Sequence, residues 1–278
     1  MLIALVLILS AALAVVGCLG SGAFLGLSWL WALPLSFVGN VVGLTLLALI
    51  FFLVAGLAIN TQKPQEKDSK FFRRMVEEYL AAAFKVLRVH IQVTGQQCVP
   101  ESGRFLLVCN HRHDFDPAIL LHILKGKQLA FISKREVQKY FLVGKVMHKL
   151  LCQPVNREND REALKTILKC VELLKEDEVS VAVFPEGYIH PDRKLHHFRH
   201  GVFKIAQKAK VPVVVCTMKG TNEMLPQVMH LKPAHVQLDF LTTIYPEEYQ
   251  GMTTVDLSEK VYEMMAQNLG PEYISEEG

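Results

Sequence analysis

A histidine and an aspartate separated by four residues are the first candidates for chemistry in this sequence. His111 and Asp116 lie within the stretch 110–117, between an apolar run and a segment with helical spacing. An imidazole titrates near neutral pH and can accept a proton from a hydroxyl group, while a nearby carboxylate holds its tautomer. The spacing also fits a structural role, in which Asp116 caps a helix that starts at Pro117. The two roles are compatible, so helix capping does not exclude a catalytic pair.

Further polar groups follow apolar segments that are predicted to be strands. These groups are Lys134, Arg157, Glu186 and Gly187. Ligands in open α/β sheets collect beyond the carboxyl ends of the strands, and a guanidinium binds a phosphate through paired hydrogen bonds. Taken singly, the segment 184–187 is compatible with an ordinary turn and Arg157 with a surface ion pair. Basic groups at several strand ends together predict an anionic substrate.

Apolar strands and helices alternate around these residues. Strands are predicted at 89–94, 104–109, 129–133, 152–155, 179–184, 211–217 and 235–242. Helices are predicted at 117–124, 136–150, 160–174, 201–209 and 254–269. This alternation predicts an α/β domain with a mostly parallel or mixed sheet flanked by helices. The acidic tail after Gly270 is predicted to be frayed.

The N-terminal part of the chain has the composition of a membrane anchor. Residues 1–62 contain no Asp, Glu, Lys or Arg. Because roughly 20 apolar residues cross a bilayer, we expect a transmembrane helical hairpin that turns between residues 20 and 36. A single long or re-entrant segment is the alternative. A cleaved signal peptide fits poorly, since no positive segment precedes the apolar run.

Basic residues follow the second apolar run, and they predict the orientation of the protein. They are Lys63, Lys67, Lys70, Arg73 and Arg74. An excess of Lys and Arg marks the cytoplasmic side of a membrane. We therefore expect an integral protein of the cell membrane with a membrane anchor over 1–62, an amphipathic linker helix within 63–88 and a cytoplasmic domain over 89–278. Packing of the linker helix on the domain is the default expectation.

Charge and cysteine content exclude several classes of protein. The net charge is +3, and no basic stripe with interleaved aromatic residues occurs, so nucleic-acid binding is not expected. The six cysteines form no closely spaced pair and no zinc pattern, which is typical of reduced thiols in a reducing compartment.

Together these residues resemble the 1-acyl-sn-glycerol-3-phosphate acyltransferases, glycerolipid acyltransferases with an HX4D and an FPEG motif. The order and spacing of the family recur at His111 and Asp116, at Lys134, at Arg157, at 184–187 and at 211–214. The resemblance extends over 89–221 and makes 89–278 an acyltransferase domain. It implies that His111 is the general base and that Asp116 orients it. It further implies that Glu186 and Gly187 bind the acceptor, and that Lys134 and Arg157 contact its phosphate or position the site.

The implied activity is that of a 1-acylglycerol-3-phosphate O-acyltransferase of phospholipid biosynthesis. A fatty acyl chain would pass from acyl-CoA or acyl-ACP to the free hydroxyl of lysophosphatidic acid, and phosphatidic acid would form. The expected partners are the lipid bilayer, lysophosphatidic acid and acyl-CoA or acyl carrier protein. No cofactor is expected, because the acyl donor is a co-substrate. Cys109 lies in an apolar strand and is expected to be a buried thiol rather than a nucleophile.

One departure from the family pattern concerns the acceptor. Tyr188 and Ile189 stand where the family usually has Thr-Arg, whose arginine contacts the glycerol phosphate. The phosphate would then be held by Lys134 and Arg157, with Arg193, Lys194 and Arg199 as further candidates. The alternative is that the acceptor is another lysophospholipid or lipid.

Two hypotheses from other classes use the same residues. A membrane-anchored metal-dependent phosphoesterase would take its ligands from His111, His113, Asp114, Asp116, His196, His197 and His200. Two-metal sites usually need several carboxylates at separate strand ends, and such carboxylates are sparse here. The second hypothesis is a lipid-binding protein that keeps the fold but has no catalytic activity. The presence of His111, Asp116 and Glu186 argues against it.

Overall fold

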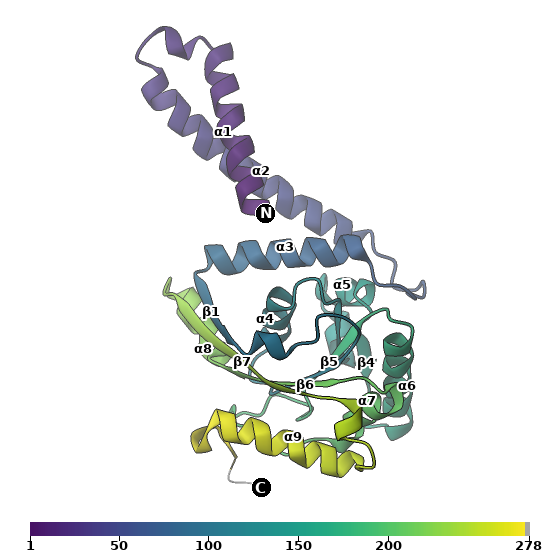
Figure 1. Ribbon diagram of the computed structural model, residues 1–278. Coiled ribbons are helices and arrows are strands. Elements are labelled where there is room, and N and C mark those ends of the chain that lie inside the picture. Colours follow the sequence, from purple (N-terminus) through teal and green to yellow (C-terminus); the bar gives the residue numbers. More distant parts are fainter. Residues whose placement is uncertain (276–278) are drawn as a thin grey trace. The chain divides into compact units, whose positions relative to one another are not determined.

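The computed structural model of the protein describes residues 1–275. The described chain falls into two compact units, one over Met1–Thr61 and one that begins at Gln62. The first unit consists of the apolar helices α1 (Leu2–Gly20) and α2 (Trp29–Leu57), which pack against each other (Figure 1). A short 3₁₀ helix, Ala23–Leu25, lies in the turn between them. Both long helices have the length and composition to cross a membrane, and the predicted helical hairpin is confirmed.

The second unit is built on a seven-stranded sheet with the order β1-β7-β6-β2-β5-β3-β4. Neighbouring strands are parallel except for the antiparallel pair of β6 and β7, so the predicted mixed sheet is confirmed. The strands are β1 (Val89–Thr94), β2 (Leu106–Cys109), β3 (Leu129–Lys134), β4 (Gln153–Val155), β5 (Ser180–Val183), β6 (Val213–Lys219) and β7 (Ala234–Ile244).

Helices cover both faces of this sheet (Figure 1). On one face, α6 (Asp160–Lys175), α7 (Lys204–Ala209) and α9 (Thr254–Leu269) form a core with the valines of β2, β5 and β6. On the other face, α3 (Lys70–Val86) contacts both α4 (Asp116–Ile123) and α5 (Val143–Lys149). The ends of α6 and α9 agree with the sequence because both helices have strong start signals. Asn159 caps α6, and Thr253 with Asp256 forms a capping box on α9.

The structure differs from the sequence-based expectations at three elements. The predicted helix 136–150 is split into a 3₁₀ helix, Arg135–Lys139, and α5, because Gly144 packs so closely on the carbonyl of Gln138 that a Cβ would not fit. Helix α8 (Thr221–Met229), which contains Pro226, was not predicted. The tail after Gly270 is ordered through Ser275, and its residues 276–278 lie outside the described part.

Helix α3 is fixed to the domain by a buried arginine. Arg73 donates hydrogen bonds to both carboxylate oxygens of Asp68, each at 2.7 Å. It also donates to the backbone carbonyls of Leu129 at 3.0 Å and Leu150 at 3.5 Å. The Arg73 side chain is 6% exposed and that of Asp68 is 1% exposed. The amphipathic helix thus packs on the domain, as the sequence predicts by default.

We expect Arg73→Met to destabilise the protein strongly, because it leaves the Asp68 carboxylate buried without its cation. Breaking a buried pair in this way costs about 3–5 kcal/mol. Denaturant unfolding of the full chain in detergent measures the loss, and Lys70→Met, an exposed position on the same helix, is the matched control. A loss for Arg73→Met no larger than that of the control would contradict this account of α3.

Candidate active site

The loop that carries the HX4D motif is tied to the centre of the sheet by an asparagine. It begins where β2 ends at Cys109 and runs to the first residue of α4, Asp116. The buried Asn110 amide donates to the backbone carbonyl of Met218 at 2.9 Å and accepts from its N–H at 2.7 Å. Because these bonds hold the loop against β6, the position of the residues that follow is set by the sheet.

The carboxylate of Asp116 holds His111 and the loop between them. One oxygen, Oδ2, accepts from Nδ1 of His111 at 2.9 Å. The same oxygen accepts from the peptide N–H groups of Arg112 at 2.6 Å and His113 at 2.9 Å. Asp116 is fully buried and lies inside α4, whose N-cap residue is Phe115. The capping interpretation is therefore wrong, because the carboxylate points back into the loop.

The imidazole of His111 is fixed on its face as well as at Nδ1. Its ring stacks on Phe184, with centroids 4.1 Å apart and an interplanar angle of 15°. Its side chain is 15% exposed. With Nδ1 donating to Asp116, the second nitrogen, Nε2, carries the lone pair and is available to accept a proton.

Glu186 joins the two motif loops. Its Oε1 accepts from the peptide N–H of His111 at 2.8 Å, and its Oε2 accepts from that of His196 at 3.3 Å. Only 3% of the residue is exposed. Burial raises the pKa of Glu186 to about 8, against the effect of the two N–H donors, which favour the carboxylate.

The guanidinium of Arg199 lies beside the FPEG motif, and its charge acts on Arg157. Gly187 has a φ of +89°, and a Cβ added to it would lie 2.7 Å from Nε of Arg199, so only glycine leaves room for that side chain. Burial and the charge of Arg199 lower the pKa of the half-buried Arg157. Among residues 1–275 no carboxylate forms an ion pair with either guanidinium. The Glu136 carboxylate acts on the pKa of Arg157 in the opposite direction to Arg199. Guanidinium groups that lack an ion-pair partner are able to bind an anion.

Lys134 is a predicted site residue for which the structure shows an exposed ion pair with Glu136, whose charge also acts on Arg157. It ends β3, and its Nζ lies 3.7 Å from Oε2 of Glu136 with both side chains more than half exposed. In the sheet order, β5 separates β3 from β2, the strand before His111. Its predicted contact with the phosphate stays a prediction.

Several residues around the site were given no role by sequence reasoning. They include Asn110, Arg112 and Phe184, which contact Met218, Asp116 and His111 respectively. All three stand inside or beside the two motifs, so proximity to a motif was the only available signal. Tyr273 also contacts this region, but it lies far from the motifs in sequence and nothing in its neighbourhood pointed to them.

The metal-dependent alternative lacks its ligand geometry. Across the described chain, no three His, Cys, Asp or Glu side chains come close enough to hold a metal ion together. His196 instead lies 3.0 Å from both oxygens of Asp192. Cys109 is fully buried, and burial followed by the neighbouring Cys216 raises the pKa of its thiol well above the usual range. A protonated, inaccessible thiol is a poor nucleophile.

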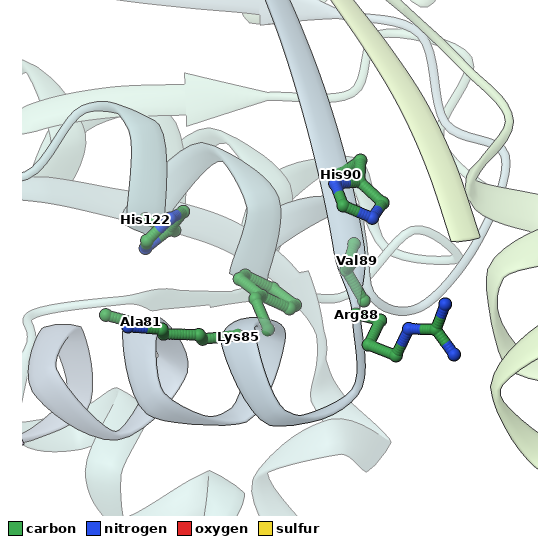
Figure 2. A pocket seen from close by; sticks show the side chains of 7 residues that line it. Ala81, Lys85, Arg88, Val89, His90 and His122 are labelled. Atoms are coloured by element: carbon green, nitrogen blue, oxygen red, sulfur yellow. The ribbon is translucent and has the colours of Figure 1, made fainter. Parts of the chain in front are cut away.

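A pocket elsewhere on the domain, shown in Figure 2, does not include any of these groups. It lies where the end of α3 meets the start of β1 and helix α4. Its lining residues are Ala81, Phe84, Lys85, Arg88, Val89, His90 and His122. No residue of the two motif loops contributes to it, so this pocket is separate from the candidate site.

Comparison with known proteins shows which proteins the chain resembles. The sequence profile of the acyltransferase family matches residues 90–219. A 1-acyl-sn-glycerol-3-phosphate acyltransferase of Bacillus subtilis is 30% identical over 150 residues, which are 52% of this chain and 72% of the relative. A chloroplastic enzyme of the same name from Arabidopsis thaliana is 31% identical over 160 residues, or 56% of this chain and 44% of the relative.

The fold agrees as well. The crystal structure of a 1-acyl-sn-glycerophosphate acyltransferase from Thermotoga maritima superposes with a TM-score of 0.61 and 23% sequence identity. The superposed region covers 79% of this chain and 86% of the Thermotoga chain. The chain spans less than half the length of the Arabidopsis relative but most of the bacterial one. On the similarity to the bacterial relative, the chain belongs to the 1-acyl-sn-glycerol-3-phosphate acyltransferase family.

Proposed function

We propose that the protein transfers a fatty acyl chain from a thioester, acyl-CoA or acyl-ACP, to the free hydroxyl of lysophosphatidic acid and forms phosphatidic acid. The observation that carries this proposal is the hydrogen bond of 2.9 Å between Nδ1 of His111 and Asp116, which leaves Nε2 as a proton acceptor. The relatives are named as 1-acyl-sn-glycerol-3-phosphate acyltransferases, which supports lysophosphatidic acid as the acceptor. The buried state of Cys109 supports direct transfer without an acyl-enzyme.

The reaction needs one base and no further protein nucleophile. Nε2 of His111 takes the hydroxyl proton as the acceptor oxygen attacks the thioester carbonyl, and Asp116 stabilises the imidazolium that forms. The thioester C–S bond then breaks, the new ester remains, and the imidazolium returns the proton to the leaving thiolate. Phe184 keeps the ring in one plane through its stacking contact. The barrier is lowered because the base is already oriented before the substrates arrive.

The acceptor phosphate is assigned to Arg157 and Arg199. A phosphomonoester bound by both guanidiniums would offset the repulsion between them and supply paired hydrogen bonds, which neither receives from a carboxylate. This pair takes the place of the arginine that the family has next to its FPEG motif, where this chain has Tyr188 and Ile189. Glu186 and Gly187 belong to the same subsite and help to bind the acceptor.

The bilayer is the proposed environment of the reaction. Helices α1 and α2 are both apolar enough to cross it, and lysophosphatidic acid and its product are membrane lipids by their chemistry. The basic residues after α2 support a cytoplasmic position of the catalytic domain.

We expect His111→Ala to lower kcat by roughly 10²–10⁴-fold, the usual contribution of a general base. An acyl-transfer assay with purified protein, lysophosphatidic acid and acyl-CoA measures the loss. His230→Ala, a change of a histidine remote from the motifs, should retain full activity. The wild-type rate should be unaffected by EDTA, and a rate abolished by EDTA would favour the metal-dependent phosphoesterase.

The variant Arg157→Ala should raise KM for lysophosphatidic acid roughly 10–100-fold, since it removes charge-assisted hydrogen bonds to the phosphate. KM for the acyl donor should change little. Arg161→Ala, on the exposed side of the neighbouring helix, is the control. Acceptors without a phosphomonoester should be poor substrates of the wild type, and a preference for them would favour the alternative acceptor.

Stability should depend on pH through Glu186. The pKa of Glu186 is about 8 in the folded protein and near 4.3 in an unfolded chain. Because the folded-state pKa is the higher one, the stabilising effect of the neutral acid is complete below the unfolded pKa. It is lost as pH rises toward about 8.

The stability of Glu186→Gln should therefore rise relative to the wild type between pH 5 and pH 8, by on the order of a few kcal/mol. Denaturant unfolding of both proteins at pH 5 and pH 8 measures the difference between their free energies of unfolding. The contributions of the other titrating groups are the same in both proteins and cancel in this difference. An equal difference at both pH values would show that Glu186 does not titrate in this range.

A further inference from the structure

Arg112, the residue after His111, is held from three directions. Its peptide N–H donates to Asp116 at 2.6 Å, and its carbonyl accepts from Nη1 of Arg193 at 2.7 Å. Its guanidinium carbon lies 4.7 Å from the ring centre of Tyr273. The whole residue is 9% exposed. A shift of this side chain would therefore move the peptide group that binds Asp116.

Tyr273 is placed to receive this cation. Its ring also faces Nζ of Lys219, at the end of β6, at 5.1 Å. Attraction between a cation and an aromatic ring strengthens when the pair is shielded from water, as Arg112 is. Nε of Arg112 is buried without a hydrogen-bond partner. The guanidinium donates one hydrogen bond, from Nη2 to Oδ1 of Asn222 at 3.4 Å. The ring of Tyr273 is its other main contact.

The segment that carries Tyr273 is bound to the loop after the FPEG motif. The N–H of Leu195 donates to the carbonyl of Tyr273 at 2.7 Å, and the N–H of Ser275 donates to the carbonyl of Leu195 at 3.1 Å. The same loop carries Arg193, which binds the Arg112 carbonyl, and His196, which binds Glu186. The HX4D loop, the loop after the FPEG motif and the C-terminal segment thus each contact the other two.

We propose that Tyr273 is a positioning residue, which acts through Arg112 to hold the loop of His111 in the geometry needed for proton transfer. Only the kinetic consequence of this proposal depends on the proposed function. Tyr273 touches neither His111 nor Asp116, and it sets their geometry through the Arg112 peptide. Its effect should therefore fall on kcat and on the mobility of the loop, with little effect on substrate affinity.

The first test is hydrogen exchange of the full chain in detergent, followed in peptides that contain the Arg112 and His113 amides. Tyr273→Leu should speed exchange of these amides roughly tenfold, since the cation–ring contact is lost. Tyr273→Phe keeps the ring, and the Tyr273 hydroxyl makes no hydrogen bond within residues 1–275, so this variant should behave as the wild type. Tyr140→Leu, at an exposed tyrosine, is a second control.

The second test is kinetic. Tyr273→Leu should lower kcat roughly tenfold while KM for both substrates stays within about twofold, and Tyr273→Phe should restore the rate. In the double variant with Arg112→Met, the loss in kcat should equal that of the larger single variant, since both act through one contact. Should Tyr273→Leu not fold, Arg112→Met alone must give the same exchange and kinetic pattern.

Two results would overturn the proposal: loop amides that exchange at the wild-type rate in Tyr273→Leu, or losses in kcat that multiply in the double variant. A wild type that transfers no acyl chain to lysophosphatidic acid would instead refute the proposed function. The exchange measurement would still decide the role of Tyr273 in that case, because it needs no substrate.

Discussion

The buried carboxylate of Asp116 is the constraint on which the rest of the site depends. One of its oxygens accepts three hydrogen bonds, two from backbone N–H groups and one from His111. Buried polar atoms need hydrogen bonds in place of their water; Oδ2 obtains them from the loop, while Oδ1 is buried without a partner among the described residues. The loop must therefore curl around the carboxylate, and this same curl turns the imidazole so that one nitrogen faces Asp116 and the other is free.

The other groups of the site are arranged around this loop by the sheet. Strands β2 and β5 are neighbours and parallel, so the residues that follow them, His111 and Glu186, emerge at the same edge. Glu186 then connects both loops through its two oxygens. Gly187 gives Arg199 the space to lie along the backbone. The proposed anion subsite is thus a direct consequence of strand order and one left-handed glycine.

The C-terminal segment adds a constraint from outside the sheet. Residues 271–275 make no strand of the sheet, yet they pair with Leu195 and place an aromatic ring against Arg112. The two motif loops are consequently held by the C-terminal segment as well, whose Tyr273 ring also faces Lys219 at the end of β6. Helix α3 is fixed to the domain in a similar way, through the buried pair of Arg73 and Asp68.

The sequence by itself determined the helical hairpin, the alternation of strands and helices, and the pair of His111 and Asp116, because hydrophobic periodicity and motif spacing are local properties. Only the tertiary structure decided that the charge of Arg199 acts on Arg157, that Lys134 pairs with Glu136, and that Asp116 does not cap its helix. The break at Gly144 and the ordered tail at Tyr273 depend on contacts with residues the local pattern does not reveal. Such contacts arise from strand order and loop packing, so they exist only once the chain has folded.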